Sequence, residues 1–240
     1  MSTRRSLFYH MKKHISISMT RTESVLSWIY WPFQLVFLPV LLAAGNELLK
    51  NPLSEVELNF AYFCVNFLCL TVILHRFLGV SAKAALKRPF YTLQSAFFGF
   101  ASYFAVSWLV GIVIIWLCPD FANANDNSIA GMLTQEPALI TMGTVLLAPI
   151  AEELMYRALI FRSLYNRSRV LAYLVTSLLF GAVHVVGYIG IYTPLELVLS
   201  MLQYLPAGIC LGWAYARSNN IFAPILMHIA INQIGILAMR

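Results

Sequence analysis

The chain has 240 residues and a formal net charge of +6, and 60% of its residues are hydrophobic while only 11% are charged. A soluble domain carries about 25% charged residues. The composition therefore excludes an ordinary soluble protein and indicates an integral membrane protein. The four cysteines lie in or beside apolar stretches without the spacing of a metal site, so we interpret them as packing residues.

Seven apolar stretches are long enough to cross about 30 Å of hydrocarbon as helices. They predict an all-α, polytopic helix bundle with about seven transmembrane helices, at residues 25–44, 56–78, 93–117, 138–161, 170–190, 194–216 and 221–239. Prolines interrupt the first and sixth stretches, which membrane helices tolerate, and we expect kinks at Pro32, Pro39 and Pro206.

The basic residues predict the orientation, because short cytosolic loops retain lysine and arginine. Thirteen of the 16 fall in the N-terminal tail or in alternate loops, all of which a cytosolic N-terminus places on the cytosolic side: Arg4, Arg5, Lys12, Lys13, Arg21, Arg76, Lys83, Lys87, Arg88, Arg162, Arg167, Arg169 and Arg217. This distribution explains the net charge through topology and anionic lipid, so no nucleic acid partner is needed.

Three ionisable residues lie inside the fourth stretch, where a charge is costly and usually functional. Glu153 and Arg157 are four residues apart, so on a helix they share a face and can pair, whereas Glu152 is turned about 100° away. The pair has a structural interpretation, in which Glu153 neutralises Arg157. Glu152 lacks such a partner and is the candidate general base or acid.

Two later stretches each contain a histidine, and both lie at a depth that tilted helices can bring to Glu152. His184 ends the segment LLFGAVH, and His228 precedes Asn232 by one helical turn. Either histidine alone reads as a hydrogen-bonded structural residue. The amide of Asn232 is a candidate for stabilising an oxyanion or orienting water. Pro149 and Pro224 precede Glu152 and His228 and remove an amide donor near the predicted site.

The motifs EELMYR, FGAVH and HIAIN, in this order on consecutive membrane segments, resemble those of the CAAX prenyl endopeptidase type II and bacteriocin self-immunity family of intramembrane proteases. The resemblance covers about residues 137–240. It implies that Glu152 activates a water, that His184 and His228 polarise water or carbonyl, that Asn232 stabilises the oxyanion, and that Glu153 and Arg157 support them. Members with eight spans occur in this family, so an eighth helix is left open.

We therefore expect a cytosolic tail at residues 1–24, N-terminal spans at 25–136 and a protease-like membrane core at 137–240. The expected substrate is a peptide or a small membrane-attached protein, and the resemblance suggests that cleavage occurs near the cytosolic face. The expected location is a lipid bilayer, in particular a bacterial plasma membrane. The oligomeric state does not follow from these patterns.

Three alternatives remain at this stage. A zinc ion on His184, His228 and Glu152 is a feasible ligand set, but we favour a mechanism without a cofactor because Glu152 then stays free as the base. A non-catalytic immunity or regulatory protein would use the same scaffold to bind a peptide. A transporter would use the same ionisable residues as a proton relay, although no paired repeat of broken helices supports that reading.

Overall fold

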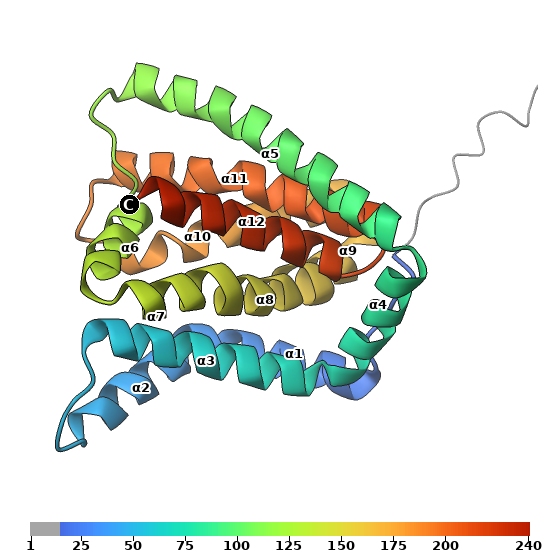
Figure 1. Cartoon of the computed structure of the whole chain (residues 1–240), viewed down its shortest axis with the longest axis horizontal. Coiled ribbons are helices and arrows are strands. Elements are labelled where there is room, and N and C mark those ends of the chain that lie inside the picture. The colour runs from blue at the N-terminus through green and yellow to red at the C-terminus, as the bar shows by residue number, and fades with distance from the viewer. Residues whose placement is uncertain (1–14) are drawn as a thin grey trace, which may run out of the picture.

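The computed structural model describes residues 15–240, and these form a helical bundle (Figure 1). The elements in chain order are α1 (Arg21–Pro32), η1 (Phe33–Phe37), α2 (Leu38–Glu47), α3 (Glu55–Ile73), α4 (His75–Lys87), α5 (Pro89–Leu117), α6 (Ala124–Gln135), α7 (Pro137–Met142), η2 (Gly143–Leu147), α8 (Ala148–Glu153), η3 (Leu154–Phe161), α9 (Arg162–Tyr165), α10 (Arg169–Val183), η4 (Val186–Tyr188), α11 (Pro194–Ser218) and α12 (Phe222–Ala238). The predicted all-α membrane bundle is confirmed.

Within residues 15–240, six continuous helical segments are long and apolar enough to cross a membrane: Arg21–Glu47, Glu55–Ile73, Pro89–Leu117, Pro137–Tyr165, Arg169–Tyr188 and Pro194–Ser218. The seventh predicted span is the shorter apolar helix α12, with 17 residues. No other apolar helix of that length class occurs in this part of the chain, so the eighth helix is not found there.

Three boundaries differ from the predictions. The second span ends at Ile73 rather than at residue 78, and α4 follows as a separate helix that carries Arg76, Lys83 and Lys87. Within the fifth span, Arg169–Tyr188, the α-helical part α10 ends at Val183, and the connection between the third and fourth spans contains α6. At α4 and α6 a partly polar segment folds as a helix of its own, which a hydropathy window does not detect.

The connections that carry basic residues gather at one end of the bundle. Figure 1 shows α4, α9 and the α11–α12 turn at this end, and α6, the α2–α3 turn and the C-terminus at the other. Residues 15–17 also lie at the basic end, where the Arg162 Nε donates to the Ile17 carbonyl at 2.6 Å and the Ser16 amide donates to Asn219 Oδ1 at 2.9 Å. Arg4, Arg5, Lys12 and Lys13 lie outside the described residues.

Two predicted proline interruptions coincide with widened, π-helical turns. Pro39 follows η1 and Pro149 follows η2, and a proline has no amide hydrogen to donate to a carbonyl in the preceding turn. The Pro149 interruption lies in the segment that carries Glu152 and Glu153. Pro206, in contrast, lies within the continuous helix α11.

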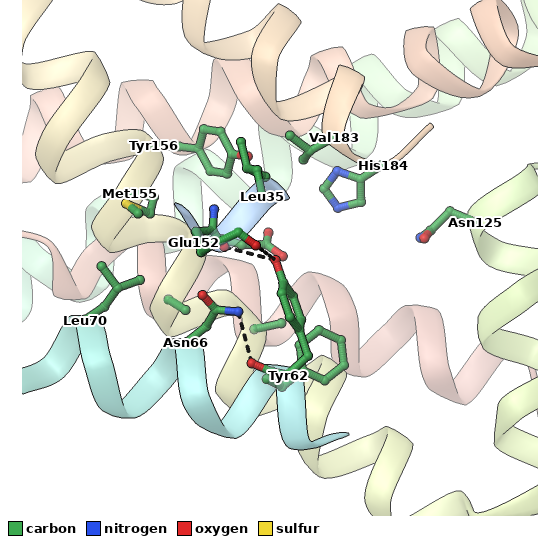
Figure 2. Close-up of a pocket in the computed structure, with 14 residues that line it drawn as sticks. Leu35, Tyr62, Asn66, Leu70, Asn125, Glu152, Met155, Tyr156, Val183 and His184 are labelled. Carbon is green, nitrogen blue, oxygen red and sulfur yellow. Dashed lines mark hydrogen bonds between the residues drawn. The ribbon is translucent and has the colours of Figure 1, made fainter. Parts of the chain in front are cut away.

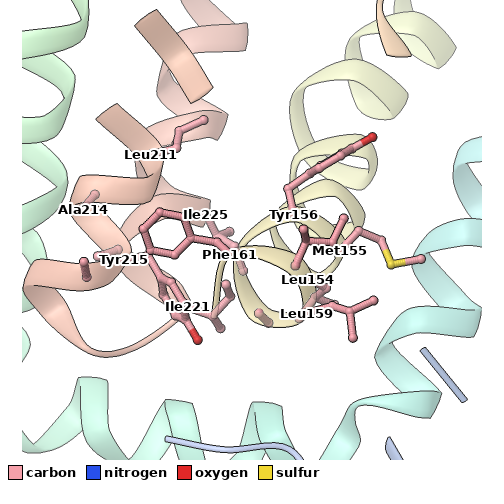
Figure 3. Close-up of a cluster of buried hydrophobic side chains, with 14 of the residues drawn as sticks. Leu154, Met155, Tyr156, Leu159, Phe161, Leu211, Ala214, Tyr215, Ile221 and Ile225 are labelled. Atoms are coloured by element: carbon pink, nitrogen blue, oxygen red, sulfur yellow. The ribbon is translucent and has the colours of Figure 1, made fainter. Parts of the chain in front are cut away.

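The core lies between η3 and α11 near the basic end. Figure 3 shows Leu154, Phe161, Leu211, Tyr215 and Ile221 in this cluster, and all five are fully or almost fully buried. The helices approach closely at two glycines of α11, which are four residues apart. A Cβ built on Gly208 would lie 2.7 Å from the Ser177 Cα, and one on Gly212 would lie 2.9 Å from the Phe161 ring.

Candidate active site

The four residues predicted to be catalytic line one cavity of about 730 Å³. Glu152 comes from α8, His184 follows the end of α10, and His228 and Asn232 come from α12. Residues separated by up to 80 positions in the chain are therefore brought together at one hollow within the bundle. The cavity is lined by both polar and apolar side chains, as a site for a peptide substrate requires.

Glu153 and Arg157 lie beneath this cavity and hold His228 in place. The Arg157 Nη1 lies 3.0 Å from the Glu153 Oε1, and both side chains are 0% exposed. The same Oε1 lies 2.8 Å from the His228 Nδ1. A carboxylate at this distance assigns a proton to Nδ1. The predicted pair thus has a second function, because it also fixes the ring and tautomer of His228.

Glu152 has a different environment from its neighbour. Its Oε2 lies 3.8 Å from the His228 Nε2, and 26% of its side chain is exposed, compared with 0% for Glu153. As the helical positions predicted, Glu153 is held in the ion pair with Arg157, whereas Glu152 faces the cavity. Of the two, only Glu152 can reach a substrate without disrupting the buried pair.

His184 is fixed by its own helix and by an aromatic neighbour. Its Nδ1 lies 2.6 Å from the Phe180 carbonyl oxygen, so Nδ1 carries the proton and Nε2 is left without it in the neutral ring. The ring stacks on Tyr204 with centroids 4.2 Å apart and an interplanar angle of 21°. His184 can therefore accept a proton at Nε2 and, once charged, donate from that atom.

Asn232 is oriented by the segment that precedes Glu152. Its Nδ2 donates to the Thr144 carbonyl at 2.8 Å. Thr144 lies in the π-helical turn η2, where backbone carbonyls depart from the regular helical pattern. The Asn232 amide has a second N–H for another acceptor.

A polar wall of the cavity, supplied by α6 and α11, was not predicted from the sequence. The Tyr204 hydroxyl accepts from the Asn125 Nδ2 at 2.9 Å and donates to the Asp126 Oδ1 at 3.2 Å. The Asn123 Nδ2 also donates to the Gln203 Oε1 at 2.6 Å. These contacts attach α6 to the helix that supports His184. The signal available in the sequence was the Asn-rich segment ANANDN, which predicts a helix cap but not a distant partner.

Asp126 faces the cavity from α6 and is exposed there. Surrounding protein nevertheless raises the pKa of its carboxyl above the ordinary value, because desolvation disfavours the charged form. The hydrogen bond from Tyr204 and the proximity of His184 oppose this increase in pKa.

A second cavity of about 180 Å³ also reaches Glu152. Figure 2 shows it between Glu152, Tyr62 and Asn66, with Met155 and Tyr156 at its far side. The Tyr62 hydroxyl lies 3.0 Å from the Gln34 Oε1, which ties α3 to η1 at this wall. Glu152 therefore lies at the boundary between a large cavity and a small one.

The side-chain arrangement gives no set of zinc ligands. Within residues 15–240, no three His, Cys, Asp or Glu side chains converge in a way that could hold a metal ion. Glu152, His184 and His228 line one cavity, and the Glu152 Oε2 lies 3.8 Å from the His228 Nε2, beyond hydrogen-bond distance. As placed, these residues do not fit the zinc alternative, and the mechanism below uses no metal.

One known protein family matches the segment of the chain that contains the site. Residues 134–234 match the family described as type II CAAX prenyl endopeptidase Rce1-like. This segment contains all the predicted site residues, and the match confirms the resemblance identified from the three motifs. No solved structure matches the chain.

Three curated bacterial proteins are also similar to this chain. UPF0177 protein YxdF of Lactococcus lactis is 27% identical over 62% of this chain and 76% of that protein. A Bacillus subtilis protein named "Putative membrane peptidase YdiL" is 28% identical over 46% of this chain and 41% of its own length. An uncharacterized 24.3 kDa protein of Escherichia coli is 34% identical over 41% and 44%, respectively. The chain thus spans less than half of the last two relatives.

Proposed function

Because residues 134–234 are similar to the type II CAAX prenyl endopeptidases, we propose that this multi-pass membrane protein is an intramembrane endopeptidase. Its substrate is a peptide or a small membrane-associated protein. The observation that carries the proposal is the cavity lined by Glu152, His184, His228 and Asn232. The membrane in question is a bacterial plasma membrane, since the similar curated proteins are bacterial.

In this mechanism Glu152 is the general base. Its carboxylate lines the cavity and accepts a proton from a water molecule, whose oxygen attacks the carbonyl carbon of the scissile bond. The His228 Nε2, held beside Glu152 by the Glu153 contact at Nδ1, orients that water. The carbonyl π electrons move to oxygen and give a tetrahedral oxyanion.

The oxyanion is stabilised by donors that are already oriented. Asn232 has one N–H engaged with Thr144 and the other available, and His184, which enters the cycle already protonated at Nε2 and keeps that proton, donates from Nε2. When the oxyanion collapses, the C–N bond breaks, and Glu152 returns its proton to the leaving amine. Glu153 and Arg157 are positioning residues that act through His228.

A cleavage screen tests this proposal. Purified protein in detergent is incubated with a proteome-derived peptide library, with and without a zinc chelator. Cleavage that resists chelation is expected. Cleavage that the chelator abolishes would support the zinc alternative. If no peptide is cut, a non-catalytic peptide-binding protein explains the site better. Substrate flux that depends on a proton gradient would instead indicate a transporter.

A further inference from the structure

The catalytic cavity is placed asymmetrically along the bundle. Its lining residues from α3 and α12 lie near the helix ends that are remote from the basic loops, namely Glu55 and Asn59 at the start of α3 and Gly235 and Met239 at the end of α12. In Figure 1 these helix ends lie together with α6, opposite α4 and α9. The cavity therefore extends from the site toward the end of the bundle that carries few basic residues.

The rim at this end is accessible. Ile191 in the α10–α11 connection is 74% exposed, and Gly187, Glu55 and Asp126 are also exposed while lining the cavity. Gly187 has open space around it, because a Cβ built there meets nothing within 4 Å. These residues form the mouth of the cavity, and we call them the α6-side mouth.

The route behind the Glu153–Arg157 pair is filled by packed side chains. Below the Glu153–Arg157 pair, Phe161, Tyr215 and Ile221 are each 0% exposed and close the space toward the basic loops (Figure 3). A peptide approaching from that end would have to displace this core and the buried ion pair. Breaking a buried pair is costly, so the geometry favours access from the α6-side mouth.

The α6-side mouth also has a charge preference. Two of the residues at the mouth, Glu55 and Asp126, are acidic, and Glu152 lies deeper in the same cavity. No lysine or arginine lines this cavity. Within residues 15–240, neither Glu55 nor Asp126 forms an ion pair with a basic residue. A cationic group on a substrate would meet complementary charge at the mouth.

We propose that the α6-side mouth receives the substrate from the non-cytosolic face of the membrane, and that it selects peptide segments with a basic residue. The inference rests on the proposed endopeptidase function and on the basic loops marking the cytosolic side. It reverses the cytosolic-side cleavage that the family resemblance suggests. The substrate class is thus a membrane-proximal, basic, non-cytosolic peptide segment.

The side of the mouth can be tested without any enzymatic activity. In a background with Cys64, Cys69, Cys118 and Cys210 replaced by serine, Gly187→Cys is compared with Gly79→Cys. Gly79 lies on α4, is exposed, and also has nothing within 4 Å, so it is a matched control at the basic end. A membrane-impermeant maleimide should label Gly187→Cys on intact spheroplasts and Gly79→Cys only after permeabilisation. The reverse pattern would overturn the proposed side of access.

Cleavage in detergent then tests whether this mouth is the route to the site. A bulky maleimide on Gly187→Cys should lower kcat/KM for a cleaved peptide at least about tenfold, because a steric block at the mouth prevents correct positioning. The same reagent on Gly79→Cys should leave it unchanged. Equal activity after both modifications would contradict access through the mouth. Absence of cleavage by the unmodified protein would instead refute the proposed function, and the labelling result would still stand.

Peptides that differ by Lys or Gln at one position test the charge preference. Wild type should cleave the Lys peptide with the higher kcat/KM, and Glu55→Gln or Asp126→Asn should each reduce that preference by about two- to fivefold, the effect of an exposed charge pair. Asn can still accept the Tyr204 hydrogen bond, so the wall is retained. The preference should also weaken as salt is added. Equal cleavage of both peptides by wild type would contradict selection of a basic residue.

Discussion

Replacing Arg157 by methionine should destabilise the protein strongly, because it leaves a carboxylate buried without its cation. Arg157 and Glu153 are both 0% exposed, with Nη1 and Oε1 3.0 Å apart. The guanidinium also lies 4.6 Å from the centre of the Phe180 ring. Methionine retains part of the side-chain volume while it removes the charge, so the measured effect reports mainly on electrostatics.

The expected loss is about 3–5 kcal/mol, the range measured when one partner of a buried ion pair is removed. At 1.4 kcal/mol per factor of ten, this corresponds to a change of roughly 10²- to 10³-fold or more in the unfolding equilibrium. His228 donates from Nδ1 to the same Glu153 oxygen at 2.8 Å, so the carboxylate keeps one partner and we expect the lower end of the range.

The assay is unfolding in detergent micelles followed by circular dichroism, with Arg76→Met as the control on the exposed face of α4. The double variant Glu153→Gln with Arg157→Met should recover a substantial part of the lost stability, because no unpaired charge remains. If Arg157→Met were no less stable than the Arg76 control, or if the double variant showed no recovery, the reasoning about the buried pair would be refuted.

Three further results are expected. Tyr204→Leu should lower kcat about 10- to 100-fold with little change in KM, because the ring stacked on His184 is lost. Tyr204→Phe keeps the ring and should retain most of the activity. Equal losses in the two variants would argue against a role for the stacking. Gly208→Val should cost at least about 1–3 kcal/mol in stability, since its Cβ meets backbone at 2.7 Å, whereas Gly111→Val in open space should be near neutral; similar melting temperatures would contradict this. Because the pKa of Asp126 is raised, the folded state binds its proton more tightly, so stability should fall as pH rises between the ordinary and the raised values, and Asp126→Asn should remove this slope.

Much of the fold follows from hydropathy and the positive-inside rule. Apolar length predicted six spans that cross and the shorter α12, because a membrane helix must satisfy its backbone internally over a fixed thickness. The same rule could not separate α4 from the second span, since Phe77 and Leu78 follow His75 and Arg76 and keep the hydropathy window apolar. Helix spacing correctly placed Glu153 with Arg157, although the local backbone is π-helical from Leu154 to Phe161.

The rest of the site depends on contacts between distant segments. Nothing in local spacing pairs Asn125 with Tyr204, which are 79 residues apart. The contact from Glu153 to His228 likewise joins two helices across 75 positions. The helical positions of Glu152 and Glu153 correctly predicted different environments for the two carboxylates. Helical spacing could not show that Glu152 and Glu153 lie beside opposite nitrogens of the His228 ring.

The central claim is that Glu152 performs the chemistry while Glu153 holds the site together, and a paired measurement separates them. For Glu152→Gln and Glu153→Gln, kcat/KM on one cleaved peptide and the melting temperature are measured together. We expect Glu152→Gln to lose at least about 100-fold in kcat/KM with a nearly unchanged melting temperature, whereas Glu153→Gln should lower the melting temperature as well as activity. Full activity of Glu152→Gln in a folded protein would contradict it.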